Sequence, residues 1–219
     1  MKVGCTIVVT LLVSATASAG ILTQVNSVGV LAPDSVVTWG TALDEGNSPA
    51  SPYTRTSTRG LGVTAVHTGD FLILAQGSSF FGNFAGGDIV LNSNFVDGPV
   101  AINFASAIQG LGLQIQRDEL GAFTATMTAF GAGNVNFGSV NVNGTTSFSN
   151  PGNNTAPFLG LVSSARDIVS VQLSVSHTDG VAGDTVDFTN LSILTPVPEP
   201  STAVLVLAGA LLAVWKKRR

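Results

Sequence analysis

Three aspartates near the C-terminal end of the chain have the spacing of residues that can share a metal ion. Asp179, Asp184 and Asp187 lie close together around the glycines Gly180 and Gly183. Calcium takes several oxygen ligands, which flexible loops can supply, although this segment lacks the pattern of an EF-hand. Aspartate is also common in turns because its carboxylate bonds nearby backbone groups. The three aspartates are therefore calcium candidates, with ordinary turn residues as the alternative.

The side chains that most often act in catalysis are few and scattered. The histidines are His67 and His177, which have no metal-binding spacing, so we expect them on the surface or at strand ends. The Gly-x-Ser-x-Gly nucleophile motif is absent. Adjacent acids such as Asp118 and Glu119 point to opposite sides of a strand, whereas glycosidases need two facing carboxylates. The sequence favours a non-catalytic protein without a cofactor.

Charge and cysteine content exclude further kinds of cross-link and binding partner. Cys5 is the only cysteine, which rules out disulfides in a chain that loses its leader. Residues 20–195 hold four arginines, no lysine and twelve acidic residues, a net charge of −8. Such a surface repels phosphate, so we expect no nucleic-acid partner. Most other polar residues are Ser, Thr and Asn, which suits contact with neutral polar material.

Aromatic and amide side chains together suggest sugar binding as one such contact. The candidates are Trp39, Tyr53 and the asparagine-rich segments 92–94 and 150–154. Aromatic rings offer apolar faces and amides offer both donors and acceptors. Trp39 lies in an expected strand, where burial in the core is the alternative.

Alternating apolar residues predict half-buried antiparallel strands in the second half of the chain. The run 123–129 alternates with Thr124, Thr126 and Thr128, a ladder that faces either solvent or ice; we favour solvent because a single strand shows it. A glycine-rich turn at 131–134 predicts a hairpin. Further strands are expected at 100–104, 111–115, 135–142, 158–162, 168–175 and 186–194.

The first half has shorter apolar runs separated by turn residues. Residues 20–40 predict two short strands, and 41–60 an irregular loop. Segments 61–67 and 71–76 predict a hairpin that turns at 68–70, and the glycine- and phenylalanine-rich segment 78–88 a loop. Together these patterns predict an all-β domain over residues 20–195, an antiparallel β-sandwich or jelly roll.

Both ends of the chain carry targeting signals. Residues 1–19 combine Lys2, an apolar run at 3–13 and the small residues 17–19, which together predict a signal peptide removed by signal peptidase. At the other end, prolines in 196–202 keep the chain extended. Residues 203–215 predict a short transmembrane helix, and the basic end at 216–219 is expected on the cytoplasmic side.

The tail resembles the PEP-CTERM sorting signal of Gram-negative and related bacteria. The resemblance rests on Pro198, Glu199 and Pro200, followed by Ser201, Thr202, the apolar helix and the basic end. It implies recognition and processing by an exosortase, a transient inner-membrane anchor, and then release to the cell surface or the extracellular space. The same tail is also catalogued as an ice-binding protein C-terminal domain, which describes the tail alone.

The body is similar to a group of secreted bacterial β-sandwich proteins without a settled activity. The similarity rests on Asp34-x-x-x-x-Trp39-Gly40 and on the segments 82–88, 110–116 and 156–160. We therefore expect an exported protein with a structural or matrix-interaction role. The alternative is a lectin-like module that binds extracellular polysaccharide, and a secreted carbohydrate-active enzyme comes third.

Overall fold

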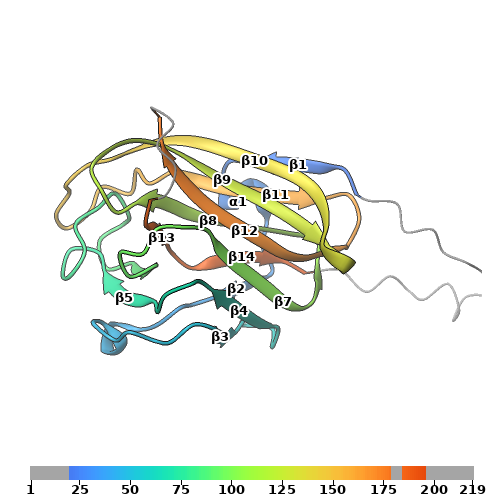
Figure 1. Cartoon of the computed structure of the whole chain (residues 1–219), viewed down its shortest axis with the longest axis horizontal. Coiled ribbons are helices and arrows are strands. Elements are labelled where there is room, and N and C mark those ends of the chain that lie inside the picture. The colour runs from blue at the N-terminus through green and yellow to red at the C-terminus, as the bar shows by residue number, and fades with distance from the viewer. Residues whose placement is uncertain (1–19, 179–183, 196–219) are drawn as a thin grey trace, which may run out of the picture.

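The computed structural model describes residues 20–178 and 184–195, which form an antiparallel β-sandwich (Figure 1). One sheet of the described chain has eight strands and the other has six. This confirms the all-β sandwich predicted from the alternating pattern. The signal peptide at 1–19, the tail at 196–219 with Pro198, Glu199 and Pro200, and Asp179 lie outside the described residues and stay predictions.

The six-stranded sheet has the order β10-β9-β12-β7-β4-β3, which Figure 1 shows from top to bottom. The hairpin of β9 and β10 turns at the glycine-rich segment 131–134, as predicted. The bounds of these strands are β3 (Tyr53–Thr56), β4 (Gly62–Val66), β7 (Val100–Ile108), β9 (Gly121–Gly131), β10 (Val135–Thr146) and β12 (Ile168–His177).

The eight-stranded sheet has the order β1-β11-β8-β13-β6-β5, and β14 pairs with both β8 and β2. A short helix, α1 (Val28–Leu31), and two 3₁₀ turns, Ala42–Asp44 and Ala132–Asn134, complete the regular structure of the described chain. The bounds are β1 (Leu22–Val25), β2 (Ser35–Val37), β5 (Leu72–Ala75), β6 (Ile89–Asn92), β8 (Gly110–Arg117), β11 (Phe158–Ser163), β13 (Val186–Phe188) and β14 (Leu191–Leu194).

The core lies between the two sheets because alternate residues of each strand point inward. On β9 the inward residues, Phe123 and Met127 among them, are fully buried. Trp39 and Phe188 pack edge to face in the same core, with ring centroids 5.6 Å apart. A second, smaller cluster, which includes Leu74, Phe84 and Val90, covers the outer face of β5 and β6. Strands at this end of the eight-stranded sheet are therefore buried on both faces.

Two predictions for the first half of the chain are wrong. β4 pairs with β3 and β7 in one sheet, whereas β5 pairs with β6 in the other, so residues 68–70 connect two sheets and do not turn a hairpin. The supposed loop 41–60 contains β3. In both cases the local turn residues were recognised, but strand partners depend on the whole fold.

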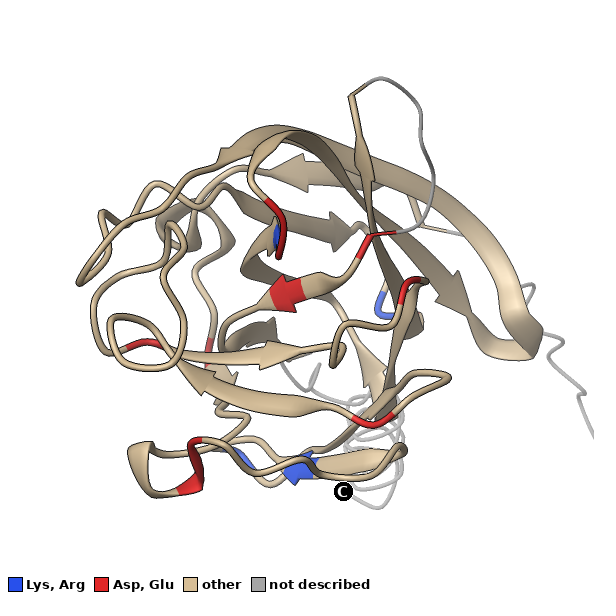
Figure 2. Ribbon diagram, turned by 60° about the vertical axis from the view of Figure 1, so that its left-hand side comes forward, with Lys and Arg blue, Asp and Glu red and all other residues tan. Residues whose placement is uncertain are grey.

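Charged residues are sparse over the sandwich, as the mostly uncoloured ribbon of Figure 2 shows. The strands β4, β7, β9 and β10 contain no Asp, Glu, Lys or Arg, and β12 carries none before it ends at His177. The outer face of the six-stranded sheet therefore presents mainly hydroxyl and amide groups. This agrees with the expectation of a neutral polar surface.

Candidate functional site

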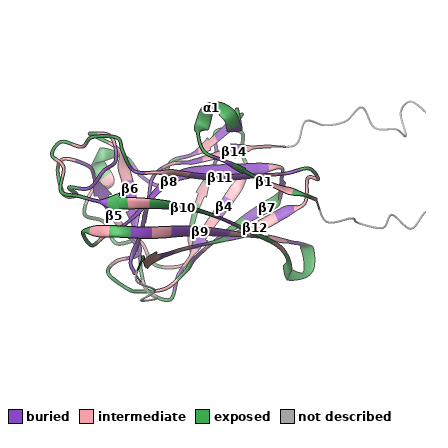
Figure 3. Ribbon diagram, turned by 90° about the horizontal axis from the view of Figure 1, so that it is seen from above, coloured by how far each residue is buried: buried purple, intermediate pink, exposed green. Residues whose placement is uncertain are grey.

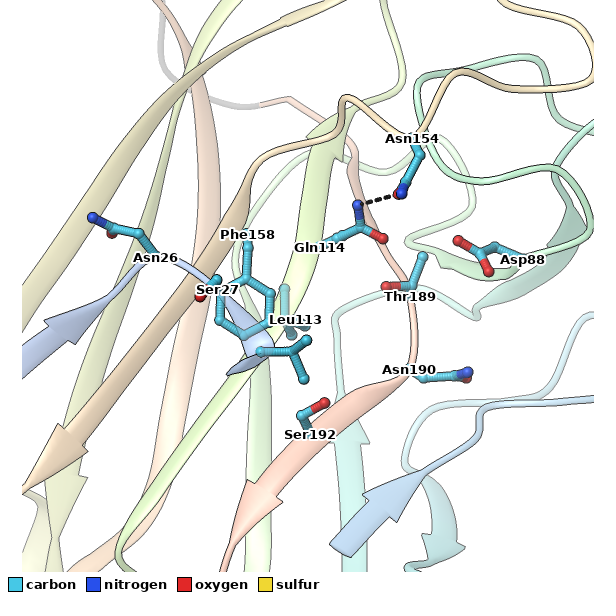
Figure 4. A pocket seen from close by; sticks show the side chains of 11 residues that line it. Asn26, Ser27, Asp88, Leu113, Gln114, Asn154, Phe158, Thr189, Asn190 and Ser192 are labelled. Atoms are coloured by element: carbon cyan, nitrogen blue, oxygen red, sulfur yellow. Dashed lines mark hydrogen bonds between the residues drawn. The ribbon is translucent and has the colours of Figure 1, made fainter. Parts of the chain in front are cut away.

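A groove of about 390 Å³ lies on the outer face of the eight-stranded sheet. Figure 3 shows α1 standing outside the layer that β1, β11 and β14 form, where it borders this face. Figure 4 shows side chains from several distant segments lining one hollow. The lining residues are Asn26, Ser27, Val28, Asp88, Leu113, Gln114, Asn154, Phe158, Thr189, Asn190 and Ser192.

Two glycines form a floor beneath Phe158, one of the residues that line the groove. Because Leu111 and Leu113 of β8 point into the core, Gly112 faces outward, in register with Gly160 of β11. A Cβ on Gly112 would lie only 2.3 Å from Cζ of the Phe158 ring, and one on Gly160 would lie 2.8 Å from Cε1 of the same ring. The phenylalanine ring therefore rests directly on backbone, which leaves an open apolar patch at the floor.

A break between two strands forms one side of the groove. β13 and β14 pair with the same edge of β8, and Thr189 and Asn190 separate them. The backbone of Thr189 is fixed because its N–H donates to the Gln114 carbonyl at 3.1 Å and its carbonyl accepts from Trp39 Nε1 at 3.1 Å. The Asn190 side chain has a buried Oδ1 atom without a hydrogen-bond partner in the described chain. The Asn190 side chain therefore borders the groove while its oxygen stays enclosed.

Two amides meet at the rim. Gln114 Nε2 donates to Asn154 Oδ1 at 2.9 Å and to the Ala156 carbonyl at 3.1 Å (Figure 4). These bonds hold both side chains in place and still leave the Gln114 oxygen and the Asn154 amino group for a ligand. The rim therefore offers both an acceptor and a donor.

Asp88 is the only ionisable residue among those that line the groove. Burial raises the pKa of its carboxyl, and a hydrogen bond from the Ala85 N–H at 3.1 Å acts in the opposite direction. No lysine or arginine is among the lining residues. The groove consequently offers no positive group to an anionic ligand.

A second hollow, of about 450 Å³, lies beside β4 and the end of β7. It is lined largely by small or apolar residues such as Gly60, Leu61 and Ala105. It therefore offers fewer side-chain donors and acceptors than the groove.

A buried arginine closes one end of the sandwich. Arg117 is fully buried, and its guanidinium contacts His177 Nδ1 at 2.7 Å, Glu119 at 2.6 Å and Asp184 at 3.5 Å. One ligand atom from each of these three partners lies within 4.8 Å of the others, a spacing that a metal ion could use. The permanent charge of the arginine offsets one of the two carboxylates and opposes the entry of a second cation.

The two calcium candidates that the structure describes, Asp184 and Asp187, point to different partners. Asp184 contacts Arg117, whereas Asp187 is paired across strands with Asn92 and Gln116 on the other face of β13. Both histidines lie at strand ends as expected: His177 ends β12, and His67 directly follows β4, where it is buried beside Phe71. Burial lowers the pKa of His67.

The aromatic candidates for sugar binding belong to the core instead. Trp39 is fully buried, and the Tyr53 hydroxyl donates to the Trp39 carbonyl at 2.7 Å. Asn92 is fully buried as well. Of the segment 150–154, Asn154 lines the groove. The core position of Trp39 was the alternative kept open above.

Sequence reasoning missed Phe158, Gln114, Asn190 and Ser192. A usable signal was present, because Gly110, Gly112 and Gly160 occupy alternate positions in two apolar strands. Outward glycines in a strand often mark the close approach of another group. What the pattern lacked was the information that these two strands are neighbours.

No helix within the described residues is long and apolar enough to cross a membrane. No family model matches the chain, and no curated protein matches its sequence.

Several solved structures are similar to this chain, three of them as follows. A DUF4465 family protein from Bacteroides caccae has 11% identity, covers 73% of this chain and 99% of its own, and gives a TM-score of 0.39. CsCBM6-3 from Clostridium stercorarium, solved with cellobiose, has 9% identity over 68% and 94% of the two chains, at a TM-score of 0.33. TmCBM61, solved with beta-1,4-galactotriose, has 17% identity over 73% and 99%, at 0.26. Similarities at this level transfer no ligand to this chain.

Proposed function

We propose that the protein binds a neutral polysaccharide in the groove on the eight-stranded sheet and performs no catalysis there. The observation that carries this proposal is the lining of the groove, where Phe158 provides an apolar ring among side-chain amides and hydroxyls. A sugar ring presents apolar C–H faces and hydroxyl groups that both donate and accept. Amides match such hydroxyls because each amide also offers donors and acceptors.

The size and charge of the groove narrow the class of ligand. Its volume, about 390 Å³, lies within the usual range for small-ligand sites, roughly 300–1,000 Å³. The lack of a lysine or arginine in the lining disfavours phosphorylated or acidic sugars. A neutral chain of sugar residues fits best.

A non-catalytic role is supported by the same residues. Hydrolysis of a glycosidic bond commonly uses two carboxyl groups placed on either side of the bond. Among the lining residues, Asp88 alone has a carboxyl group. Binding without bond cleavage is therefore the simpler role for the groove.

The proposed export route would place the groove where polysaccharide occurs. The leader at 1–19 and the motif Pro198-Glu199-Pro200 support export, a transient inner-membrane anchor and processing by an exosortase. The first and last described strands also reach the same end of the sandwich. Leu22 pairs with Ser163, the Ser163 N–H donates to the Gln109 carbonyl, and the Gln109 N–H donates to the Leu194 carbonyl. A tether there would leave the groove open on the side of the molecule.

Affinity electrophoresis and calorimetry with the full-length chain test the binding proposal. The chain is purified in a detergent without a sugar head group, and neutral and acidic polysaccharides are compared. We expect binding to a neutral polysaccharide, with affinity reduced by more than about tenfold in Phe158→Ala and by about three- to tenfold in Gln114→Ala. Thr126→Val, on the other sheet, is the matched control and keeps full affinity.

The proposal is wrong if no neutral polysaccharide is retained, or if Phe158→Ala binds as tightly as the unchanged chain. Release of reducing sugar by the purified protein would overturn the non-catalytic part alone. For the export route, replacement of Pro198, Glu199 and Pro200 by alanine should leave the unprocessed chain in the inner membrane. Mass spectrometry of the C-terminus of the exported protein checks this.

A further inference from the structure

Asp187 is buried in the middle of a row of polar side chains on the outer face of the eight-stranded sheet. It pairs in register with Asn92 of β6 on one side and with Gln116 of β8 on the other, so the three side chains share one face. All three are fully buried. The second apolar cluster covers this end of the sheet, and the Asn83 N–H reaches down to Gln116 Oε1 at 2.9 Å.

Two oxygen atoms in this row have no partner. Asn92 Nδ2 donates to Asp187 Oδ1 at 2.6 Å, which fixes the two side chains against each other. Within the described chain, Asp187 Oδ2 and Asn92 Oδ1 are both buried and accept no hydrogen bond. Buried polar atoms nearly always have a partner, and an isolated buried carboxylate is costly. A group outside the protein chain would remove both deficits.

A second carboxylate lies close by. The Asp118 N–H donates to the Thr185 carbonyl at 3.4 Å, so the end of β8 runs beside the start of β13. Asp118 is half-buried and carries a second negative charge next to Asp187. The neighbouring Arg117 does not compensate these charges, because it pairs with Val186 and points to the opposite face, towards Glu119 and His177.

We propose that Asp187, Asn92 and Asp118 bind a divalent cation, and that this cation is calcium. The oxygen atoms available here are two carboxylates and one amide carbonyl, the ligand types that calcium prefers. Calcium also tolerates irregular geometry, whereas magnesium demands a near-ideal octahedron. The ion would give both unpartnered oxygens a ligand and would balance the two carboxylates, while water and backbone carbonyls would complete its shell.

Two simpler explanations account for fewer of the unpartnered atoms and charges at this site. Protonation of Asp187 would remove its charge, and the acid could donate to Asn92 with the amide turned over, but the second Asp187 oxygen and the Asn92 amino group would then lack partners. A buried water molecule could bridge these oxygens and the unpartnered Gln116 Nε2, but it would not neutralise the acids. Of the two calcium candidates among the described residues, the proposed site keeps Asp187, because Asp184 is held by Arg117.

Calcium titration of the full-length chain tests the site. The protein is treated with a chelator, freed of it, and followed by thermal unfolding and by calorimetry. We expect one ion per chain and a rise in Tm of about 5–10 °C at a calcium concentration near 100 times Kd, with a smaller shift for magnesium. No heat and no shift in Tm would overturn the proposal and would favour the buried water.

Variants locate the ion. Asp187→Asn should abolish the calcium-dependent shift in Tm, and Asp118→Asn should weaken binding by at least about tenfold. Asp70→Asn, an exposed aspartate, and Glu119→Gln, in the arginine cluster, should both keep the shift. Should Asp187→Asn fail to fold, Asn92→Asp provides the test, because an added carboxylate should tighten calcium binding by about tenfold. Weaker binding in Asn92→Asp, or loss of the shift in Glu119→Gln alone, would contradict the assignment.

Discussion

The outer faces of the two sheets are built from similar residues but differ in what they leave unpaired. On the six-stranded sheet the hydroxyls bond to one another across strands: Thr124 donates to Asn143 at 2.9 Å, and Thr128 and Ser139 lie 2.8 Å apart. On the eight-stranded sheet, a strand break and the glycines beneath Phe158 accompany a groove, and the enclosed Asn190 Oδ1 beside it has no partner in the described chain. Similar composition therefore gives a self-satisfied surface on one side and a candidate binding site on the other.

The cross-strand hydrogen bonds of the six-stranded sheet show how its threonine ladder is used. Thr124, Thr126 and Thr128 are half-buried, and two of them take part in cross-strand hydrogen bonds. Their neighbours on β10 and β12 are serines, asparagines and one glutamine, so the polar rows do extend over several strands. The ladder is thus part of a broad sheet face, and its paired hydroxyls make an ordinary solvent face the better interpretation.

The largest expected effect comes from filling the floor of the groove. Gly112→Ala places a Cβ where the Phe158 ring lies, 2.3 Å from Cζ, so the ring must move. We expect polysaccharide affinity to fall by more than about tenfold and stability to fall by about 1–3 kcal/mol, the usual cost of overpacking. Calorimetry and urea unfolding measure the two effects. Unchanged binding would show that the groove does not hold the ligand.

The substitution Asn190→Ala should weaken polysaccharide binding without a matching loss of stability. Its Oδ1 has no partner within the described chain, so removal of the side chain should change stability by no more than about 0.5 kcal/mol. Loss of an amide that borders the groove should still weaken binding by about three- to tenfold. Equal losses in both measurements would instead indicate that Asn190 supports the fold.

Thr124→Val, combined with Thr126→Val and Thr128→Val, should leave polysaccharide affinity within about twofold of the unchanged chain. The three side chains lie on the six-stranded sheet, whereas the groove lies on the eight-stranded sheet. Valine keeps the branched shape and the strand preference, so only cross-strand hydrogen bonds are lost, roughly 1 kcal/mol each. A large loss of binding would move the site to this face. If the threonine ladder is an ordinary solvent face, the unchanged chain should show no thermal hysteresis, which is a parallel check.

The smallest expected effect is a change in the pH dependence of stability in Asp88→Asn. Burial raises the pKa of Asp88, so above the unfolded pKa, near 3.9, the folded chain binds more protons than the unfolded chain. The Asp88 contribution to stability should therefore decrease as pH rises through the folded pKa. The variant should lack this decrease, which urea unfolding across pH 4 to 7 can measure. The same change of unfolding free energy with pH in both proteins would contradict this prediction.

Local patterns in the sequence predicted many of the strands and one turn. The alternation at 123–129 correctly predicted β9, and the glycines at 131–134 predicted its hairpin with β10, because both signals depend only on adjacent residues. The sparse charge, the leader at 1–19 and the sorting motif at 198–200 are likewise properties of the sequence. The export predictions rest on these alone.

The tertiary structure decided which strands are neighbours, and with that every candidate site. Gly112 and Gly160 form one floor only because β8 pairs with β11, although they are far apart in the chain. Asp187 meets Asn92 only because β13 lies beside β6, and Asp184, three residues away, is drawn to Arg117 instead. Strand pairing is a long-range choice made by the packing of the whole core, which local residue patterns do not encode.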